Sequence, residues 1–199
     1  DTVLDLGGSG GSESDVVVVN AGATLDATGI AGFTATNATT NKSTDASNAT
    51  LTAKANAAVT IDVSGAKSDS KGFTLEGGSG SGNDVLKGGA AADIITGGAQ
   101  VDTITGNGGV DTISGGAGDD IITANSGDNS LFGGEGADTI NAGTGRDVIT
   151  GGVGNDVINL LATSGNGTDT ILYSGLTDSL NGSDTITNFK TDDMHDFSD

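Results

Sequence analysis

A nine-residue repeat runs through the middle of the chain and limits its possible folds more than any other feature. From Ser79 to Asn159 nine consecutive units follow one another without a gap, each close to Gly-Gly-x-Gly-x-Asp-x-aliphatic-x. A tenth unit, Ser164 to Leu172, follows a four-residue interruption at 160–163. A flexible glycine-rich linker has no reason to keep this phase. The repeat therefore predicts an ordered solenoid in which each unit is one structural step.

The eighth position of every unit carries a large aliphatic residue. In chain order these are Leu86, Ile95, Ile104, Ile113, Ile122, Leu131, Ile140, Ile149 and Ile158, with Ile171 in the tenth unit. Their neighbours are often β-branched, as in Ile94–Thr96, which is typical of a three-residue strand that turns one aliphatic side chain inward. The glycines before each strand permit positive φ and let successive backbones approach closely.

The sixth position carries an aspartate or its amide. These residues are Asp84, Asp93, Asp102, Asp111, Asp120, Asn129, Asp138, Asp147, Asp156 and Asp169. Each stands beside glycines in a loop that presents backbone carbonyls, so carboxylate and carbonyl oxygens come together. Ca²⁺ takes about six to eight such hard oxygen ligands. The sequence therefore predicts these ten residues as metal ligands.

The remaining ligands are expected to be backbone carbonyls of the loop glycines. The predicted set is Gly80, Gly82, Gly88, Gly97, Gly98, Gly106, Gly108, Gly115, Gly116, Gly118, Gly133, Gly134, Gly136, Gly145, Gly151, Gly152 and Gly154.

The GGxGxDxUx pattern resembles the repeat of the RTX (repeat-in-toxin) calcium-binding proteins, strongly over 79–172 and weakly over 182–199. The resemblance implies an all-β fold, a right-handed parallel β-roll in which two units make one coil and several Ca²⁺ ions lie between coils. It also implies export of the unfolded parent protein by type I secretion machinery, and so an extracellular or bacterial cell-surface location.

Two units per coil would place equivalent residues 18 positions apart. One edge would then stack Asp84, Asp102, Asp120, Asp138 and Asp156, and the other Asp93, Asp111, Asn129 and Asp147, followed by Asp169. Carboxylates stacked at strand spacing, about 4.8 Å, repel one another. Residues 77–199 also hold 18 acidic and 3 basic residues. We therefore expect this part to stay unfolded without a divalent cation.

Three units depart from the pattern. The sixth, ANSGDNSLF, has Ala124-Asn125 for the glycine pair and Asn129 for aspartate, so the sites on either side of it are expected to be weak or empty. The second and third have Ala91 and Gln100 in place of the third glycine, which puts the geometry of their carbonyls in question.

Composition divides the chain into three segments. Residues 1–76 are rich in Thr, Ala, Asn and Val, and strands are expected at Val16–Val19, Ala58–Val63 and Phe73–Leu75. We predict that they form further β-helical coils without Ca²⁺ loops, with a surface loop near 34–52. The calcium-binding roll would cover 77–172. Residues 173–199 resemble the closing segment of such arrays, although His195 stands where an apolar residue is usual.

The composition also excludes several functions. With no Cys and a single His, a disulfide scaffold, a zinc site and a Cys-His or Ser-His-Asp nucleophile are all but ruled out. Seven basic residues against 27 acidic ones leave no basic surface for nucleic acid. No apolar run approaches the length of a membrane span. No catalytic constellation is present, so we expect the chain not to be an enzyme.

Two functional hypotheses remain open. In the first, the chain belongs to a secreted structural protein (an S-layer, adhesin or extracellular filament) that folds and assembles on binding Ca²⁺. Its partners would be further copies of itself or a cell-surface polysaccharide. In the second, it is the C-terminal secretion and folding module of a secreted enzyme or toxin, such as a protease, lipase or alginate epimerase. The Thr- and Ala-rich residues 1–76 favour the first.

Overall fold

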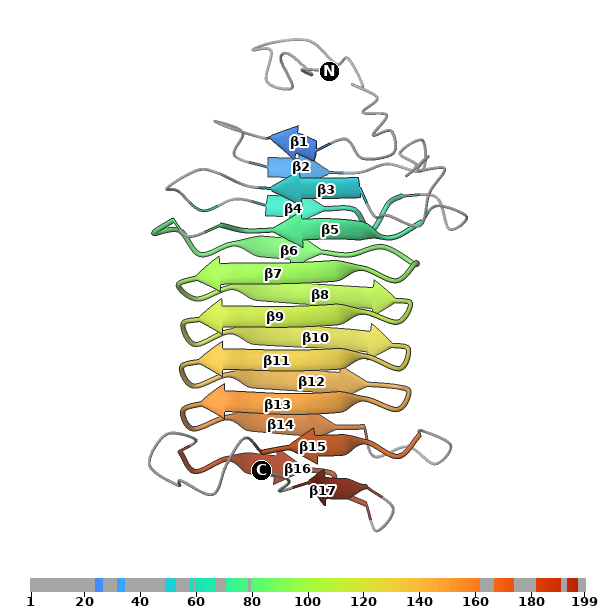
Figure 1. Cartoon of the computed structure of the whole chain (residues 1–199), viewed down its shortest axis with the longest axis vertical. Coiled ribbons are helices and arrows are strands. Elements are labelled where there is room, and N and C mark those ends of the chain that lie inside the picture. The colour runs from blue at the N-terminus through green and yellow to red at the C-terminus, as the bar shows by residue number, and fades with distance from the viewer. Residues whose placement is uncertain are drawn as a thin grey trace.

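The computed structural model describes residues 24–26, 32–34, 49–52, 58, 60–66, 71–78, 80–161, 167–173, 182–190 and 193–196. All the secondary-structure elements in these ranges are β-strands, and the strands stack into one elongated body (Figure 1). Among the residues described, none forms a helix long and apolar enough to cross a membrane.

The strands alternate between two parallel sheets. The odd-numbered ones form a nine-stranded sheet: β1 (Thr24–Asp26), β3 (Ala49–Thr52), β5 (Phe73–Glu76), β7 (Ile94–Ala99), β9 (Thr112–Ala117), β11 (Ser130–Glu135), β13 (Val148–Val153), β15 (Thr170–Leu172) and β17 (Met194–Asp196). The even-numbered ones form an eight-stranded sheet: β2 (Gly32–Thr34), β4 (Thr60–Asp62), β6 (Val85–Lys87), β8 (Thr103–Gly108), β10 (Ile121–Ser126), β12 (Thr139–Gly143), β14 (Val157–Leu160) and β16 (Thr185–Thr187).

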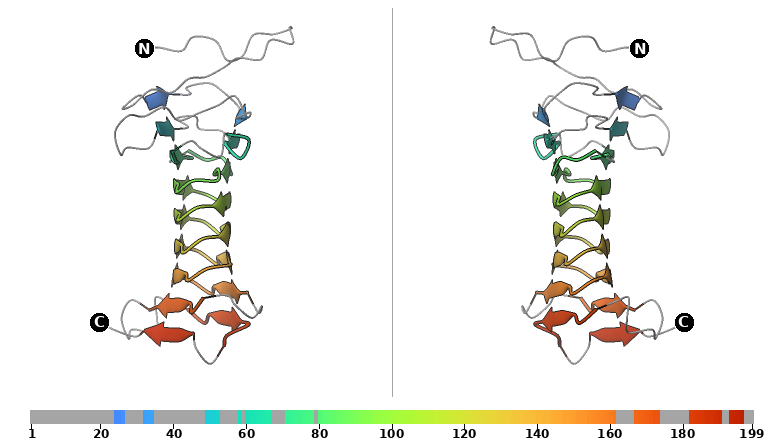
Figure 2. Two further views of the ribbon diagram at one scale, coloured as in Figure 1. Left: turned by 90° about the vertical axis from the view of Figure 1, so that its right-hand side faces the viewer. Right: turned by 90° about the vertical axis from the view of Figure 1, so that its left-hand side faces the viewer.

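Each strand pairs in parallel with the strand two elements later, so two strands make one coil. Within the array the register is 18 residues, as in Ile104↔Ile122 and Ile95↔Ile113. Figure 2 shows the two sheets facing each other across a narrow gap, with short loops joining them at both edges. This confirms the predicted parallel β-roll.

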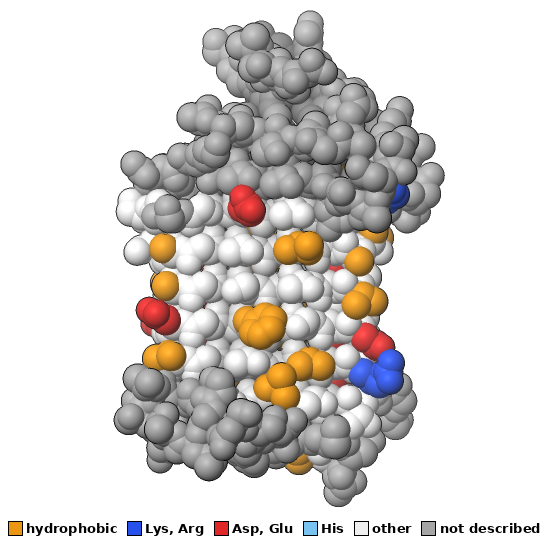
Figure 3. All heavy atoms as spheres, in the orientation of Figure 1, with side chains coloured by type: hydrophobic (Ala, Val, Ile, Leu, Met, Phe, Trp, Pro, Cys, Tyr) orange, Lys and Arg blue, Asp and Glu red, His pale blue; other side chains and the backbone are white. Residues whose placement is uncertain are grey.

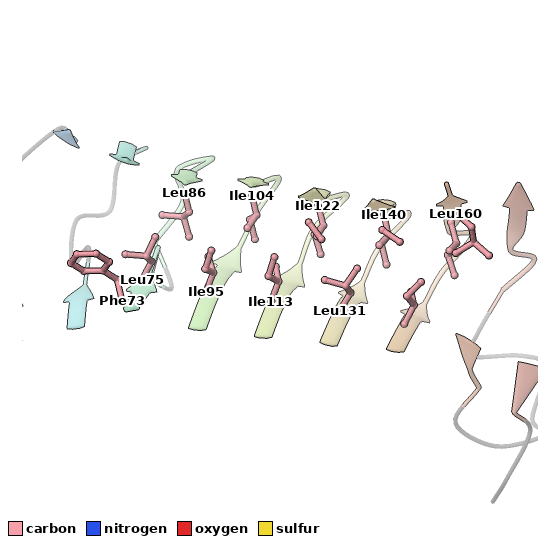
Figure 4. Packing of buried hydrophobic residues seen from close by; sticks show 14 of the residues in the cluster. Phe73, Leu75, Leu86, Ile95, Ile104, Ile113, Ile122, Leu131, Ile140 and Leu160 are labelled. Carbon is pink, nitrogen blue, oxygen red and sulfur yellow. The ribbon is translucent and has the colours of Figure 1, made fainter. Parts of the chain in front are cut away.

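The core is a double row of aliphatic side chains between the sheets (Figure 4). The eighth-position residues from Leu86 to Ile171 are all buried, with at most 1% of their surface exposed. Their seventh- and ninth-position neighbours face outward, as the alternation of side chains along a strand requires. The core is therefore thin, because each sheet contributes a single layer of aliphatic side chains.

From β7 to β14 the strands of the array are longer than the three residues predicted, whereas β6 and β15 have three. β7 continues from Ile94 through the glycine pair to Ala99, and β9 does the same to Ala117. Pairing resumes at Gly98↔Gly116 after Thr96↔Ser114, which leaves one residue of each strand unpaired. Gly98 and Gly116 have φ of 118° and 116°, so glycine at this position lets the ladder run on into the loop.

The coil extends to the N-terminal side of the repeats. β1 to β4 pair in the same two sheets, and β5 pairs with β7 across the boundary predicted at 76/77. The predicted strands at 58–63 and 73–75 correspond to β4 and β5. The predicted loop near 34–52 is too long at both ends. Thr34 is the last residue of β2, and residues 49–52 form β3, whose Leu51 pairs with Leu75. Residues 35–48 and the strand expected at Val16–Val19 lie outside the described residues.

At the C-terminal end the coil continues past the interruption at 160–163. β15, β16 and β17 each add to a sheet, and β17 pairs with β15 so that His195 is opposite Ile171. His195 thus occupies an eighth position, where the other strands of the array carry an aliphatic residue.

Candidate metal centre

The sixth-position side chains form two hydrogen-bonded ladders, one along each edge of the roll. In each ladder the Oδ1 of one residue accepts the backbone N–H of the equivalent residue one coil earlier, as from Asp102 N to Asp120 Oδ1 at 2.7 Å. One ladder contains Asp84, Asp102, Asp120, Asp138, Asp156 and Asp184. The other contains Asp93, Asp111, Asn129, Asp147, Asp169 and Asp193.

All ten predicted side chains lie in these ladders, and each is at most 4% exposed. The structure therefore brings them together in the two stacks expected from the 18-residue spacing. Sequence reasoning missed Asp184 and Asp193 as ladder members. Asp184 stands in the degenerate repeat at 182–186 and could have been included from its phase. Asp193 follows Thr191-Asp192, without the glycines that mark a repeat, and only the coil geometry places it.

The second carboxylate oxygen of most ladder aspartates is buried without a hydrogen-bond partner. This holds for Oδ2 of Asp102, Asp111, Asp120, Asp138, Asp147 and Asp156. At the N-terminal end the Oδ2 of Asp93 accepts the backbone N–H of Gly89 at 2.6 Å. A buried, unpaired carboxylate oxygen is costly, and a bound cation is the ordinary way to satisfy one.

The first glycine of each unit makes room for that second oxygen. A Cβ on Gly97, Gly115 or Gly133 would lie 2.2 to 2.5 Å from Oδ2 of the aspartate five residues later. The same Cβ would approach the carbonyl oxygen of the first-position glycine one coil further on at 2.4 to 2.6 Å. The carboxylate oxygen and carbonyl oxygens therefore converge beside a glycine that has no side chain.

Positive φ at the second and fourth positions brings the loop carbonyls of successive coils into line. A Cβ on Gly116 would lie 2.1 Å from Gly98 O, and one on Gly134 would lie 2.0 Å from Gly116 O. Asn107, Asn125 and Gln100 keep positive φ at these positions, between 71° and 76°. The backbone of units three, four and six thus follows that of the glycine units, whereas Ala91 keeps an ordinary φ. Which carbonyls act as ligands stays a prediction.

Burial sets the protonation of the ladder carboxyls. It raises the pKa of Asp111 and Asp120 to about 7, and that of Asp93, Asp102, Asp138 and Asp147 to about 6. The hydrogen bond from the preceding rung opposes this shift. The like charge of a neighbouring rung adds to it, as from Asp138 and Asp102 at Asp120. The metal-free ladder thus disfavours the charged form that a cation needs.

The donor set fits Ca²⁺. Among the described residues no three acidic, His or Cys side chains converge, so an ion here would take most of its ligands from backbone carbonyls. Oxygen-only sites of this kind select hard cations that accept irregular, high coordination, and they lack the nitrogen and sulfur ligands typical of zinc. The unpartnered Oδ2 atoms and the glycine space beside them meet this requirement.

The model of the RTX calcium-binding nonapeptide repeat, in four copies, matches residues 78–113, 105–140 and 132–171. Residues 78–171 belong to the RTX calcium-binding repeat family. No curated protein and no solved structure gave a significant match to the chain. RTX repeats bind Ca²⁺, and the succession of them here implies several ions. Bound Ca²⁺ would neutralise the ladders, while the protein's own part is to hold Oδ2 and the loop carbonyls at fixed positions between coils.

The space beside the ladder can be tested with two glycine variants. Gly115→Ala places a methyl group 2.2 Å from Asp120 Oδ2, and should lower the free energy of unfolding in saturating Ca²⁺ by about 1–3 kcal/mol. Gly108→Ala is the matched control, because its nearest neighbour would be 3.6 Å away and its φ is ordinary, so its effect should be close to zero. Urea unfolding measures both, and equal effects would contradict this account of the first glycine.

Acid should partly replace calcium. The ladder carboxyls have a higher pKa in the metal-free roll than the usual value of about 3.9 in an unfolded chain, so the roll binds more protons than the unfolded state. The stability of the metal-free roll should therefore rise as pH falls below about 7. Circular dichroism in excess chelator should show more β structure at pH 5 than at pH 8.

Asp120→Asn removes one titrating rung and should weaken this pH response, whereas Glu135→Gln at an exposed position of β11 should leave it unchanged. A β content in chelator that is the same at both pH values would contradict the assignment.

Proposed function

We propose that the chain is part of a secreted structural protein of the bacterial surface that folds and assembles when it meets Ca²⁺ outside the cell. The calcium-binding roll is typical of secreted proteins. The surface role, the assembly and a non-enzymatic nature are our proposal.

The observation that carries the proposal is the row of buried carboxylate oxygens without partners. Each coil of the array buries two sixth-position side chains next to two core aliphatic side chains. The free-energy cost of burying the charged groups therefore opposes the free energy gained by burying the aliphatic ones. The metal-free chain should then be largely unfolded, which suits passage through a secretion channel. Extracellular calcium modules commonly bind with dissociation constants of about 10⁻⁴–10⁻³ M, so the roll would form only outside the cell.

Assembly is supported by the outer face of the nine-stranded sheet. From β7 to β15 its outward seventh and ninth positions are uncharged: Ile94, Thr96, Thr112, Ser114, Ser130, Phe132, Val148, Thr150, Thr170 and Leu172. Ile94, Phe132 and Val148 are 46%, 41% and 39% exposed. In Figure 3 the described surface is mostly uncharged, with separate apolar side chains along the roll. In a chain of net charge −20, two copies would approach best over such a face.

Calcium-coupled folding is tested by circular dichroism of the chain at pH 7.5. β structure should be largely absent in excess chelator and should appear on titration to millimolar Ca²⁺, since the cation removes the cost of the buried carboxylates. Mg²⁺ at the same concentration is the control and should act weakly, because it prefers octahedral sites that keep several waters. Equal β content in chelator and in Ca²⁺ would refute the proposal.

Assembly is tested by light scattering during the same titration. Scattering should rise steeply and reversibly with Ca²⁺, and Phe132→Thr should raise the protein concentration required by about tenfold, because a buried aromatic anchor commonly contributes more than 1 kcal/mol. Ile121→Thr is the control, since Ile121 is 45% exposed on the opposite sheet. Compaction at constant monomer mass would instead favour a folding module of a secreted enzyme.

A further inference from the structure

One rung differs chemically from all others in its ladder. Asn129 Oδ1 accepts the N–H of Asp111 at 2.9 Å, as the aspartates do. Its other terminal atom is a donor: Nδ2 donates to Gly127 O at 3.0 Å. The rungs on either side of it, Asp111 and Asp147, each offer a buried oxygen without a partner, whereas this one offers an N–H₂ group already paired to a loop carbonyl. The position lacks a carboxylate oxygen, and one of its carbonyls is already in use.

The space for an ion is also reduced at this place. Ala124 and Ala142 stand at the first position of their units and are fully buried. The first residue of the other units from Gly88 to Gly151 is glycine, and the space that its missing side chain leaves lies against the second carboxylate oxygen. At units 124–132 and 142–150 a methyl group fills that space.

A cation supplied by the protein bridges the same two units. The Arg146 guanidinium contacts Asp128 Oδ2 through Nη2 at 2.9 Å and Nε at 3.3 Å, and the backbone N–H of Arg146 donates to Asp128 Oδ1 at 2.9 Å. The stem of Arg146 lies against Gly167 in the following coil. Asp128 and Arg146 directly precede Asn129 and Asp147, so this ion pair joins the loops of the altered rung and the next one.

We propose that units 124–132 and 142–150 are joined without calcium. The Asn129 amide takes the place of the carboxylate, and the Arg146–Asp128 ion pair links the two loops at the surface, where its side chains are 71% and 46% exposed. The ladder of Asp93 is then divided into two calcium-binding stretches, whereas the ladder of Asp84 is continuous. Three features coincide at this one junction: a neutral rung, filled glycine spaces and a surface ion pair between the two loops. The inference rests on the proposed calcium binding of the other rungs.

The test is a count of Ca²⁺ bound to the full chain at saturation, by native mass spectrometry and by equilibrium dialysis. The triple variant Ala124→Gly/Ala142→Gly/Asn129→Asp restores both the two glycine spaces and the missing oxygen, and it should bind one ion more than the wild type. Adding Arg146→Ala to this triple variant should let it gain the same ion at lower Ca²⁺ concentration, because the nearby positive charge is gone. Asn83→Asp adds the same charge at an exposed loop position and should not change the count.

An unchanged count in the triple variant, with a wild type that binds several ions, would overturn the inference and leave the proposed function standing. A wild type that binds no Ca²⁺ would refute the proposed function itself. Asn129→Ala covers the case in which the acidic variant does not fold. It should bind as many ions as the wild type, and the loss of one ion would identify Asn129 as a ligand and overturn the inference.

Discussion

The hydrogen bond from a backbone N–H to the Oδ1 of the aspartate one coil later organises the rest of the roll. It holds each sixth-position side chain against the backbone of the preceding coil, as between Asp93 N and Asp111 Oδ1 at 2.8 Å. With one oxygen fixed in this way, the other must point into the loop. A Cβ on the first-position glycines Gly97, Gly115 or Gly133 would collide with it, which accounts for glycine at these positions. The spacing of glycine and aspartate in the repeat thus follows from one contact.

The same contact explains why a cation is part of the fold. Burial of an aliphatic side chain contributes about 1.5–3 kcal/mol, and each coil of the array has two at its eighth positions. Burial of an uncompensated charge costs several kcal/mol, and each coil of the array has up to two of these. The opposing terms are of similar size, so the thin core leaves no surplus to set against the entropy of ordering glycine-rich loops. Neutralising the carboxylates, by Ca²⁺ or by protons, shifts this balance toward the roll.

Much of this architecture could be predicted because the repeat keeps its phase. The inward aliphatics and the two columns of aspartates followed directly from positions eight and six. The strand ends did not, since the continuation of β7 to Ala99 depends on how Gly98 pairs with Gly116 and not on β propensity. β3 was missed for a related reason. Ala49–Thr52 lies in a Thr- and Asn-rich run with little apolar content, and its pairing with β5 is a long-range contact that no local pattern reports.

The departures from the repeat are distributed unevenly over the two edges. The units that build the ladder of Asp102 to Asp156 all begin with a glycine pair, at 97–98, 115–116, 133–134 and 151–152. The units of the opposite edge carry Asn107, Ala124, Asn125 and Ala142 at these positions. Because successive units alternate between edges, a change in one unit alters one ladder and leaves the other intact. A roll with two edges can therefore keep one of them uniform for ion binding while the other acquires amides and an ion pair. On that second edge the Asn125 amide contacts Asn107 Oδ1 one coil away at 3.4 Å, so side chains there link the coils directly, independently of any metal ion.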